Sequence, residues 1–194
     1  MGTVLHNAIA LRAKYDDGFH WMPLLELVSH ETLHLWNGEL LRRHHPKEHY
    51  FWFSEGFTEF YTPRILLRQG LIDEADYRAI RHRTIEEYNQ SPARHLTNEE
   101  LSIRFWADHD AQRMTYLRGA LFALHLDTEL RTRGHSLDLI MAELIDLARR
   151  DGIRFHADLL IDHLKPHISG APELYQSYIL NGKSIPTPEE ILPH

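Results

Sequence analysis

The stretch VSHETLH, residues 28–34, decides how this sequence is interpreted. On a helix, positions i and i+4 lie on one face, so His30 and His34 can bind one zinc ion together. Glu31 follows His30 directly and can reach a zinc-activated water without being a ligand itself. That division of roles suits hydrolysis, because zinc lowers the pKa of its water to about 7 and a carboxylate takes the proton. Because the chain has 16 histidines, this spacing can also arise by chance. The alternative is that His30 and His34 face solvent or cap the core and bind no metal.

A second stretch, WFSEGFTEFY at residues 52–61, offers a third ligand. Catalytic zinc sites use three protein ligands and keep one position open. Glu55, 21 positions after His34, would complete that set from a second helix packed on the first. The alternative for Glu55 is a solvated acid near a helix N-terminus. Glu59, one turn further on, either accepts a hydrogen bond from the outer ring nitrogen of a zinc-bound histidine or is an exposed helix charge.

Composition removes several classes of function. The 194 residues suffice for one domain with a core, and 43% are hydrophobic. The absence of cysteine excludes disulfides, thiolate metal sites and a cysteine nucleophile. A net charge of -7, with scattered basic residues, argues against nucleic acid as the partner. No apolar run approaches the roughly 20 residues of a membrane helix, so we expect a soluble protein. Whether it works in the cytoplasm or the periplasm, and in which oligomeric state, is left open by the sequence.

Helical patterns dominate the rest of the chain. Pro63 is expected to kink or interrupt its segment. Only Val4–Ala13 suggests a strand, so the predicted fold is mainly α with at most a short N-terminal β element. The predicted helices are Met22–Asn37, Phe51–Gln69, Asp73–Tyr88, Asn98–Trp106, Met114–Arg133, Leu137–Arg150, His156–Lys165 and Pro172–Leu180.

The blocks HETLHLWNGE (30–39) and WFSEGFTEFYT (52–62) resemble the M61 glycyl aminopeptidase family, a gluzincin group related to the M1 aminopeptidases. RQGL at 68–71, SPAR at 91–94 and YLRG at 116–119 resemble later blocks of that family, in the same order. The resemblance implies a thermolysin-like helical catalytic domain over residues 1–194. It also implies that Tyr116 hydrogen-bonds the oxyanion of the tetrahedral intermediate, which would stabilise charge that appears only in the transition state.

Four departures from the family pattern matter. Leu5 stands where M1 enzymes carry the glutamate that contacts the free amine of the substrate, which weakens the expectation of strict aminopeptidase specificity. Arg118 replaces the usual lysine and keeps its charge. The spacing to Glu55 is about two residues longer than in M1 enzymes, which the loop at 42–49 can absorb. The flanking β-domain and PDZ domain of the family are absent, so we expect an excised catalytic domain.

Two interpretations of function follow. The first is an active zinc peptidase, expected to be aminopeptidase-like, that hydrolyses a peptide or protein substrate with a metal-activated water. Its metal ligands are His30, His34 and Glu55, with Glu31 as base and Tyr116 as oxyanion donor. His109 is a further candidate donor, on the evidence of its position before the Tyr116 segment alone. The second interpretation is a weakly active or inactive peptidase-fold module that binds peptides or serves as a scaffold.

Overall fold

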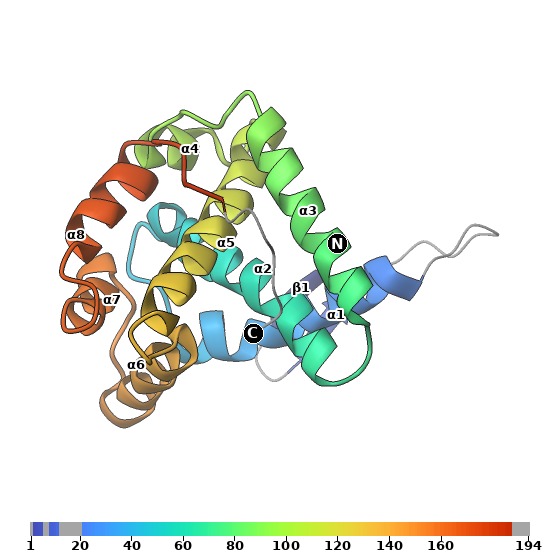
Figure 1. Ribbon diagram of the computed structural model, residues 1–194, viewed down its shortest axis with the longest axis horizontal. Coiled ribbons are helices and arrows are strands. Elements are labelled where there is room, and N and C mark those ends of the chain that lie inside the picture. Colours follow the sequence, from blue (N-terminus) through green and yellow to red (C-terminus); the bar gives the residue numbers. More distant parts are fainter. Residues whose placement is uncertain (1, 6–7, 12–20, 188–194) are drawn as a thin grey trace.

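A computed structural model describes residues 2–5, 8–11 and 21–187. Within these ranges the chain is mainly helical, as predicted, with one small hairpin (Figure 1). The strands are β1 (Gly2–Leu5) and β2 (Ala8–Leu11), and the α-helices are α1 (Trp21–Leu33), α2 (Phe51–Arg68), α3 (Glu74–Gln90), α4 (Asn98–Arg104), α5 (His109–Arg131), α6 (Leu137–Asp151), α7 (Ala157–Leu164) and α8 (Ala171–Leu174). Irregular helical turns follow at Leu35–Leu40, Lys47–Tyr50 and Tyr175–Leu180.

Helices α2 and α5 form the centre of the fold (Figure 1). Twelve of the 18 residues of α2 are buried, because its aromatic side chains pack between α5 and the C-terminal helices. Gly56 and Gly119 let the two backbones approach closely. A Cβ built on Gly119 would lie 1.8 Å from the carbonyl oxygen of Trp52, and one built on Gly56 would lie 2.3 Å from the Cα of Gly119. The absence of side chains at both positions therefore sets the distance between the two central helices.

A buried ion pair connects α2 to α5 and to the start of α6. Arg64 and Asp127 are 2% and 0% exposed, and Arg64 Nη1 lies 3.0 Å from Asp127 Oδ2. Asp127 also accepts hydrogen bonds from the Leu137 backbone at 2.9 Å and from Arg131 Nε at 2.9 Å. The buried carboxylate thus has a partner for both oxygens, which is the condition under which a buried charge is tolerated.

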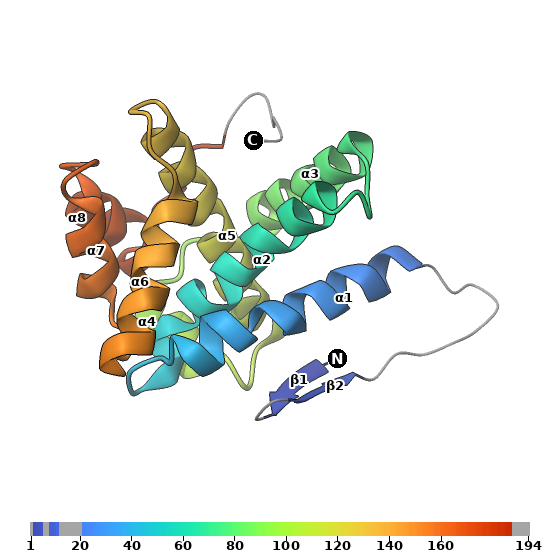
Figure 2. The same cartoon turned by 90° about the horizontal axis from the view of Figure 1, so that it is seen from below.

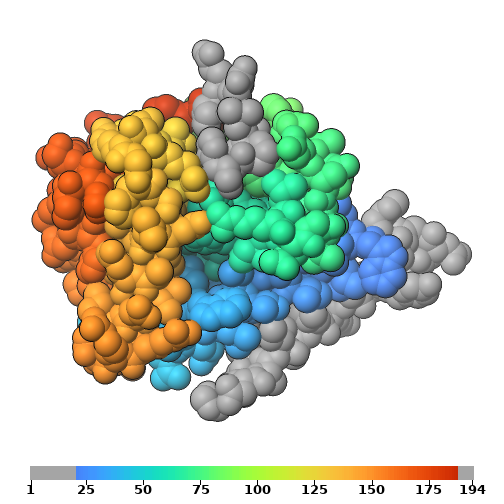
Figure 3. All heavy atoms as spheres, turned by 60° about the horizontal axis from the view of Figure 1, so that its bottom comes forward, coloured from blue at the N-terminus to red at the C-terminus, as the bar shows by residue number. Residues whose placement is uncertain are grey.

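Helix α1 lies outside this core. It packs against α2 on one side and contacts the β1–β2 hairpin on the other (Figure 2). In the space-filling view it lies at the molecular surface, close to the turn that joins α2 to α3 (Figure 3). Among the residues of α1, all of which the structure describes, Glu31 alone is buried. The helix that carries the HExxH motif is therefore the least covered of the long helices.

The structure corrects several predicted boundaries. Helix α1 ends at Leu33, and the predicted continuation to Asn37 is instead a turn in which Asn37 (ψ 64°) and Gly38 (φ 164°) leave the helical conformation. Helix α5 starts at His109 rather than Met114, because the Asp108 side chain caps it by accepting from the Asp110 and Ala111 amides. Other ends move by a few residues.

Two further predictions change. Helix α2 runs through Pro63 without interruption, so the predicted interruption was wrong, whereas the alternative of a kink stays a prediction. Burial of α2 on most of its circumference outweighs the single hydrogen bond that proline removes. The predicted strand Val4–Ala13 is an antiparallel hairpin that pairs Gly2 with Leu11, while residues 6–7 and 12–13 lie outside the described residues.

Arg118 connects two of the sequence blocks quoted above, because it lies in YLRG (116–119) and hydrogen-bonds to the backbone of SPAR (91–94). It is 0% exposed, and its Nη2 donates to the carbonyl oxygens of Arg94 at 2.9 Å and Leu96 at 2.6 Å. Burial lowers the pKa of Arg118 to about 10. The guanidinium therefore joins α5 to the turn before α4.

In the ranges that the structure covers, no helix combines the length and the apolar character that crossing a bilayer requires.

Candidate metal centre

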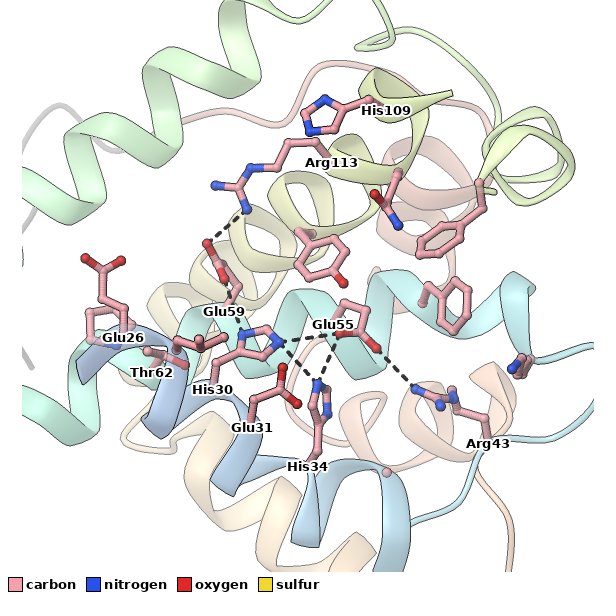
Figure 4. Close-up of a pocket in the computed structure, with 18 of the residues that line it drawn as sticks. Glu26, His30, Glu31, His34, Arg43, Glu55, Glu59, Thr62, His109 and Arg113 are labelled. Atoms are coloured by element: carbon pink, nitrogen blue, oxygen red, sulfur yellow. Dashed lines mark hydrogen bonds and ion pairs between the residues drawn. The ribbon is translucent and has the colours of Figure 1, made fainter. Parts of the chain in front are cut away.

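Helices α1 and α2 bring three potential metal ligands to one point (Figure 4). His34 Nε2 lies 3.1 Å from His30 Nε2 and 3.1 Å from Glu55 Oε2, and His30 Nε2 lies 3.4 Å from Glu55 Oε2. Zinc–nitrogen and zinc–oxygen bonds of about 2.0–2.1 Å at a tetrahedral angle separate neighbouring ligand atoms by roughly 3.3 Å. The three atoms therefore already have the spacing of ligands that share one metal ion. Within the described residues they are the one such group of histidine, cysteine and acidic side chains.

An outer contact orients His30. Its second ring nitrogen, Nδ1, lies 3.4 Å from Glu59 Oε2, so the ring can donate there while Nε2 faces the other ligands. Arg113, from α5, donates through Nη1 to the second oxygen of Glu59 at 3.2 Å. The same guanidinium also donates to Glu87 of α3 at 2.8 and 2.7 Å. Of the two alternatives for Glu59, the structure shows the contact with His30 rather than an exposed charge.

The turn after α1 orients His34. Its Nδ1 lies 3.1 Å from the carbonyl oxygen of Asn37, which the non-helical backbone at that residue turns back toward the ring. The Asn37 side chain is 6% exposed and donates to the carbonyl oxygens of Phe53 and Ser54 at 3.3 and 3.1 Å. Asn37 thus anchors the turn to α2 and aims its own carbonyl at His34. An Nδ1–H donor leaves Nε2 as the free lone pair that a metal needs.

Glu55 is held through its other oxygen. Oε2 faces the histidines, whereas Oε1 accepts from Ser54 Oγ at 3.3 Å and from Arg43 Nη1 at 3.4 Å. Arg43 also makes a short hydrogen bond to Ser54 Oγ. Each of the three ligands consequently has an outer partner that fixes the orientation of its metal-facing atom, which is typical of protein metal sites.

The electrostatics of the cluster favour a cation. Burial opposes the charging of His30, but hydrogen bonds to Glu55 and Glu59 outweigh it and raise the pKa of His30 to about 9. Burial would raise the pKa of Glu55, yet hydrogen bonds from His30 and His34 hold it well below its usual range. The pKa of Glu59 is lowered to about 2, against the effect of burial, by the hydrogen bond from His30 and the charge of Arg113. The ionised carboxylates of Glu55 and Glu59 thus favour the protonated, positively charged form of His30. A bound divalent cation would stabilise the same two negative charges in place of that proton.

Glu31 and Tyr116 face the same space from different helices. Glu31 is 8% exposed, and its carboxylate points toward the region between His30 and His34 (Figure 4). Tyr116, on α5, stacks on the His30 ring with a centroid distance of 5.9 Å and an interplanar angle of 17°. Burial and the nearby negative charge of Glu55 raise the pKa of Tyr116 far above its ordinary value, so its hydroxyl stays protonated and available as a donor.

An open cavity of about 780 Å³ contains this cluster. Glu26, Glu59 and Arg113 lie on one side of the metal centre, and Arg43 lies on the other (Figure 4). His109 also lines the cavity, but its side chain is 86% exposed and its ion-pair contact is Asp110 at 4.0 Å. The structure therefore places His109 at the rim.

The sequence predicted six residues of this site, namely His30, Glu31, His34, Glu55, Glu59 and Tyr116. It missed three others that help to hold the ligands in place: Asn37, Arg43 and Arg113. Asn37 lies in the quoted HETLHLWNGE block, so its place in that motif was a usable signal. Neither arginine has a local pattern that sets it apart from the other basic residues. The side chain of Leu5 lies outside the described part of the structure, so its effect on amine recognition stays a prediction.

The chain is similar in sequence and in structure to known peptidases. The sequence model of the M61 glycyl aminopeptidase family matches residues 23–122, a range that contains every predicted site residue. The chain is also similar to the crystal structure of an aminopeptidase N family protein from Idiomarina loihiensis, with a TM-score of 0.72 and 25% identity. That similarity covers 91% of this chain and 34% of the other, so the chain spans about a third of that protein's length. Among curated proteins, no sequence matches.

Proposed function

The chain belongs to the M61 glycyl aminopeptidase family, and on this premise we propose that it is a zinc-dependent peptidase that hydrolyses peptide bonds, with an aminopeptidase-like mode as the first expectation. His30, His34 and Glu55 would hold the zinc. The observation that carries the proposal is the triangle of ligand atoms, with sides of 3.1, 3.1 and 3.4 Å. Two histidines and one carboxylate are the donor set of zinc hydrolases that keep one position open.

The remaining residues supply the proton and charge handling. When bound, zinc would polarise the scissile carbonyl and activate a water molecule. Glu31, from the same helix as both histidines, would accept the proton of the attacking water and deliver it to the leaving nitrogen. Tyr116 would donate a hydrogen bond to the carbonyl oxygen as negative charge develops on it. Because Glu31 and Tyr116 come from different helices, they can act on different atoms of one peptide bond.

Outer contacts support this role by holding the cluster in place before any substrate arrives. Glu59 with Arg113, the Asn37 carbonyl, and Arg43 with Ser54 each fix one ligand. Such contacts typically change metal affinity by about 10–100-fold when they are removed. A pre-organised site of this kind is what electrostatic catalysis requires.

The test measures metal and hydrolysis separately. The purified chain should bind one zinc ion and hydrolyse a peptide with a free N-terminus, and a chelator should abolish that hydrolysis. Glu31→Gln should keep the zinc and lose the hydrolysis, whereas Glu55→Ala should lose the zinc. Glu86→Gln, an exposed change on α3, is the matched control and should alter neither. Absence of stoichiometric zinc would refute the proposal, and zinc without hydrolysis would favour the peptide-binding module.

A further inference from the structure

The two ends of the cavity differ in chemistry. At one end, Glu26 and Glu59 are paired with Arg83 and Arg113, and the cavity lining there also includes the aliphatic residues Leu27, Pro63 and Ile80. At the other end, beyond Arg43, the lining includes Phe51, Phe105 and Trp106. The Arg43 guanidinium lies 5.2 Å from the centre of the Phe51 ring, which places the aromatic group on the Arg43 side of the metal centre. An aromatic or large apolar side chain that enters the cavity would therefore meet a group of aromatic rings at this second end.

The three aromatic rings form a continuous surface. Phe51 and Phe105 are each 4% exposed, and their ring centroids are 4.2 Å apart. Trp106 continues the surface, with centroid distances of 4.8 Å to Phe105 and 6.1 Å to Phe51. Unlike the other two, Trp106 is 69% exposed. The floor is thus built from buried rings, and its outer wall presents a large apolar side chain to solvent.

The exposed indole is fixed rather than free to rotate. Its N–H donates to Glu48 Oε1 at 3.3 Å, and the Lys47 ammonium lies over the ring, 5.7 Å from its centre. Together with the contacts to Phe51 and Phe105, these hold the ring in one orientation. An immobilised aromatic surface that stays open to water is suited to binding, because little conformational entropy is lost when a ligand covers it.

The surface lies at a fixed distance from the metal centre. Phe51 precedes Glu55 by four residues in α2, so the two side chains share a face and are separated by about 6 Å along the helix axis. An extended peptide advances by about 3.3 Å per residue. The aromatic surface is therefore one or two peptide residues away from the ligands.

We propose that Phe51, Phe105 and Trp106 form a subsite for an aromatic or large apolar side chain of the peptide substrate, one or two residues from the bond that is cleaved. The inference rests on the proposed function in taking a peptide as the ligand. It deepens that function by assigning a side-chain class to one end of the cavity. The indole of Trp106 and the edge of Phe105 would cover the bound side chain.

The experiment uses the Glu31→Gln chain, so that peptides bind without being cleaved. A series of hexa-alanine peptides, each with one phenylalanine at a successive position, is compared by fluorescence anisotropy. One or two neighbouring positions should give about tenfold tighter binding than hexa-alanine. Adding Trp106→Ala should reduce that advantage to less than threefold. Adding Ile103→Ala, which removes a 75% exposed apolar side chain of α4 outside the cavity lining, should leave it intact.

Circular dichroism of both variants checks that the fold is kept. Equal affinity for every peptide of the series would overturn the inference. So would an advantage that survives Trp106→Ala, or one that Ile103→Ala removes equally. If phenylalanine improves binding as described but the unmodified chain hydrolyses no peptide, the subsite stands and the proposed hydrolysis fails, so the two failures are distinguishable.

Discussion

Replacing Gly119 by alanine tests whether the glycine contact between α2 and α5 sets the geometry of the site. In an unobstructed helix interior, glycine to alanine is stabilising by about 1 kcal/mol. Here the added Cβ would lie 1.8 Å from the Trp52 carbonyl oxygen and 2.8 Å from the Gly56 Cα. Both obstacles are backbone atoms, so no side-chain rotation removes the clash.

The size of the effect follows from the separation that is needed. Restoring an ordinary contact distance of about 3.5 Å requires the helices to move apart by roughly 1–2 Å. Such overpacking costs about 1–3 kcal/mol, and sometimes more. Because the contact lies at the centre of the fold, we expect the net loss for Gly119→Ala to be about 3 kcal/mol.

The assay is urea unfolding followed by circular dichroism. Gly170→Ala is the matched control, because a Cβ at Gly170 has nothing within 4 Å. Zinc affinity gives a second reading, since Tyr116 and Glu55 lie within one helical turn of the contact. A Gly119→Ala chain as stable as the Gly170→Ala chain would refute the reasoning.

Three further predictions concern single contacts. Arg113→Met should weaken zinc binding about tenfold, because it releases Glu59 from its ion pair. Arg78→Met, which removes an exposed ion pair, is the control and should leave zinc binding unchanged. Equal zinc affinities for the two variants would contradict a role for the Arg113–Glu59 contact in holding the metal site. Asn37→Ala should also weaken zinc binding, by calorimetric titration, because the carbonyl that orients His34 loses its anchor. Asp127→Asn should destabilise the fold by about 3–5 kcal/mol in denaturant, since it removes the closer carboxylate of buried Arg64 and leaves only Asp138, at 3.7 Å. Unfolding within about 1 kcal/mol of the unmodified chain would refute this.

The inner part of the site could be predicted because its geometry is local. The spacing of His30 and His34 fixes their common helix face, and Glu59 follows Glu55 by one turn for the same reason. Glu55 needed one tertiary assumption, that its helix packs on the first. Tyr116 rested on resemblance, since its pattern is that of an ordinary core aromatic.

The outer part could not be predicted, because it depends on which residues meet across helices. Arg113 contacts Glu59 over 54 positions of sequence, and Arg43 contacts Glu55 from an irregular loop. The mainly helical fold was predicted from periodicity, whereas the interruption predicted at Pro63 was wrong for a physical reason. Local rules measure the cost of one lost hydrogen bond, whereas the surrounding packing decides whether a helix tolerates it.

The peripheral position of α1 has a consequence for how the molecule opens. Only one residue of this helix is buried, so it is the long helix expected to detach at the lowest free energy. A metal ion held by His30 and His34 on one side and by Glu55 on the other would join α1 to α2 across that boundary. At a free zinc concentration about 1,000 times the Kd, binding would add about 4 kcal/mol to the opening free energy. Hydrogen exchange of the α1 amides would then slow until the helix opens only together with the core, so metal loading would set the size of the cooperative folding unit.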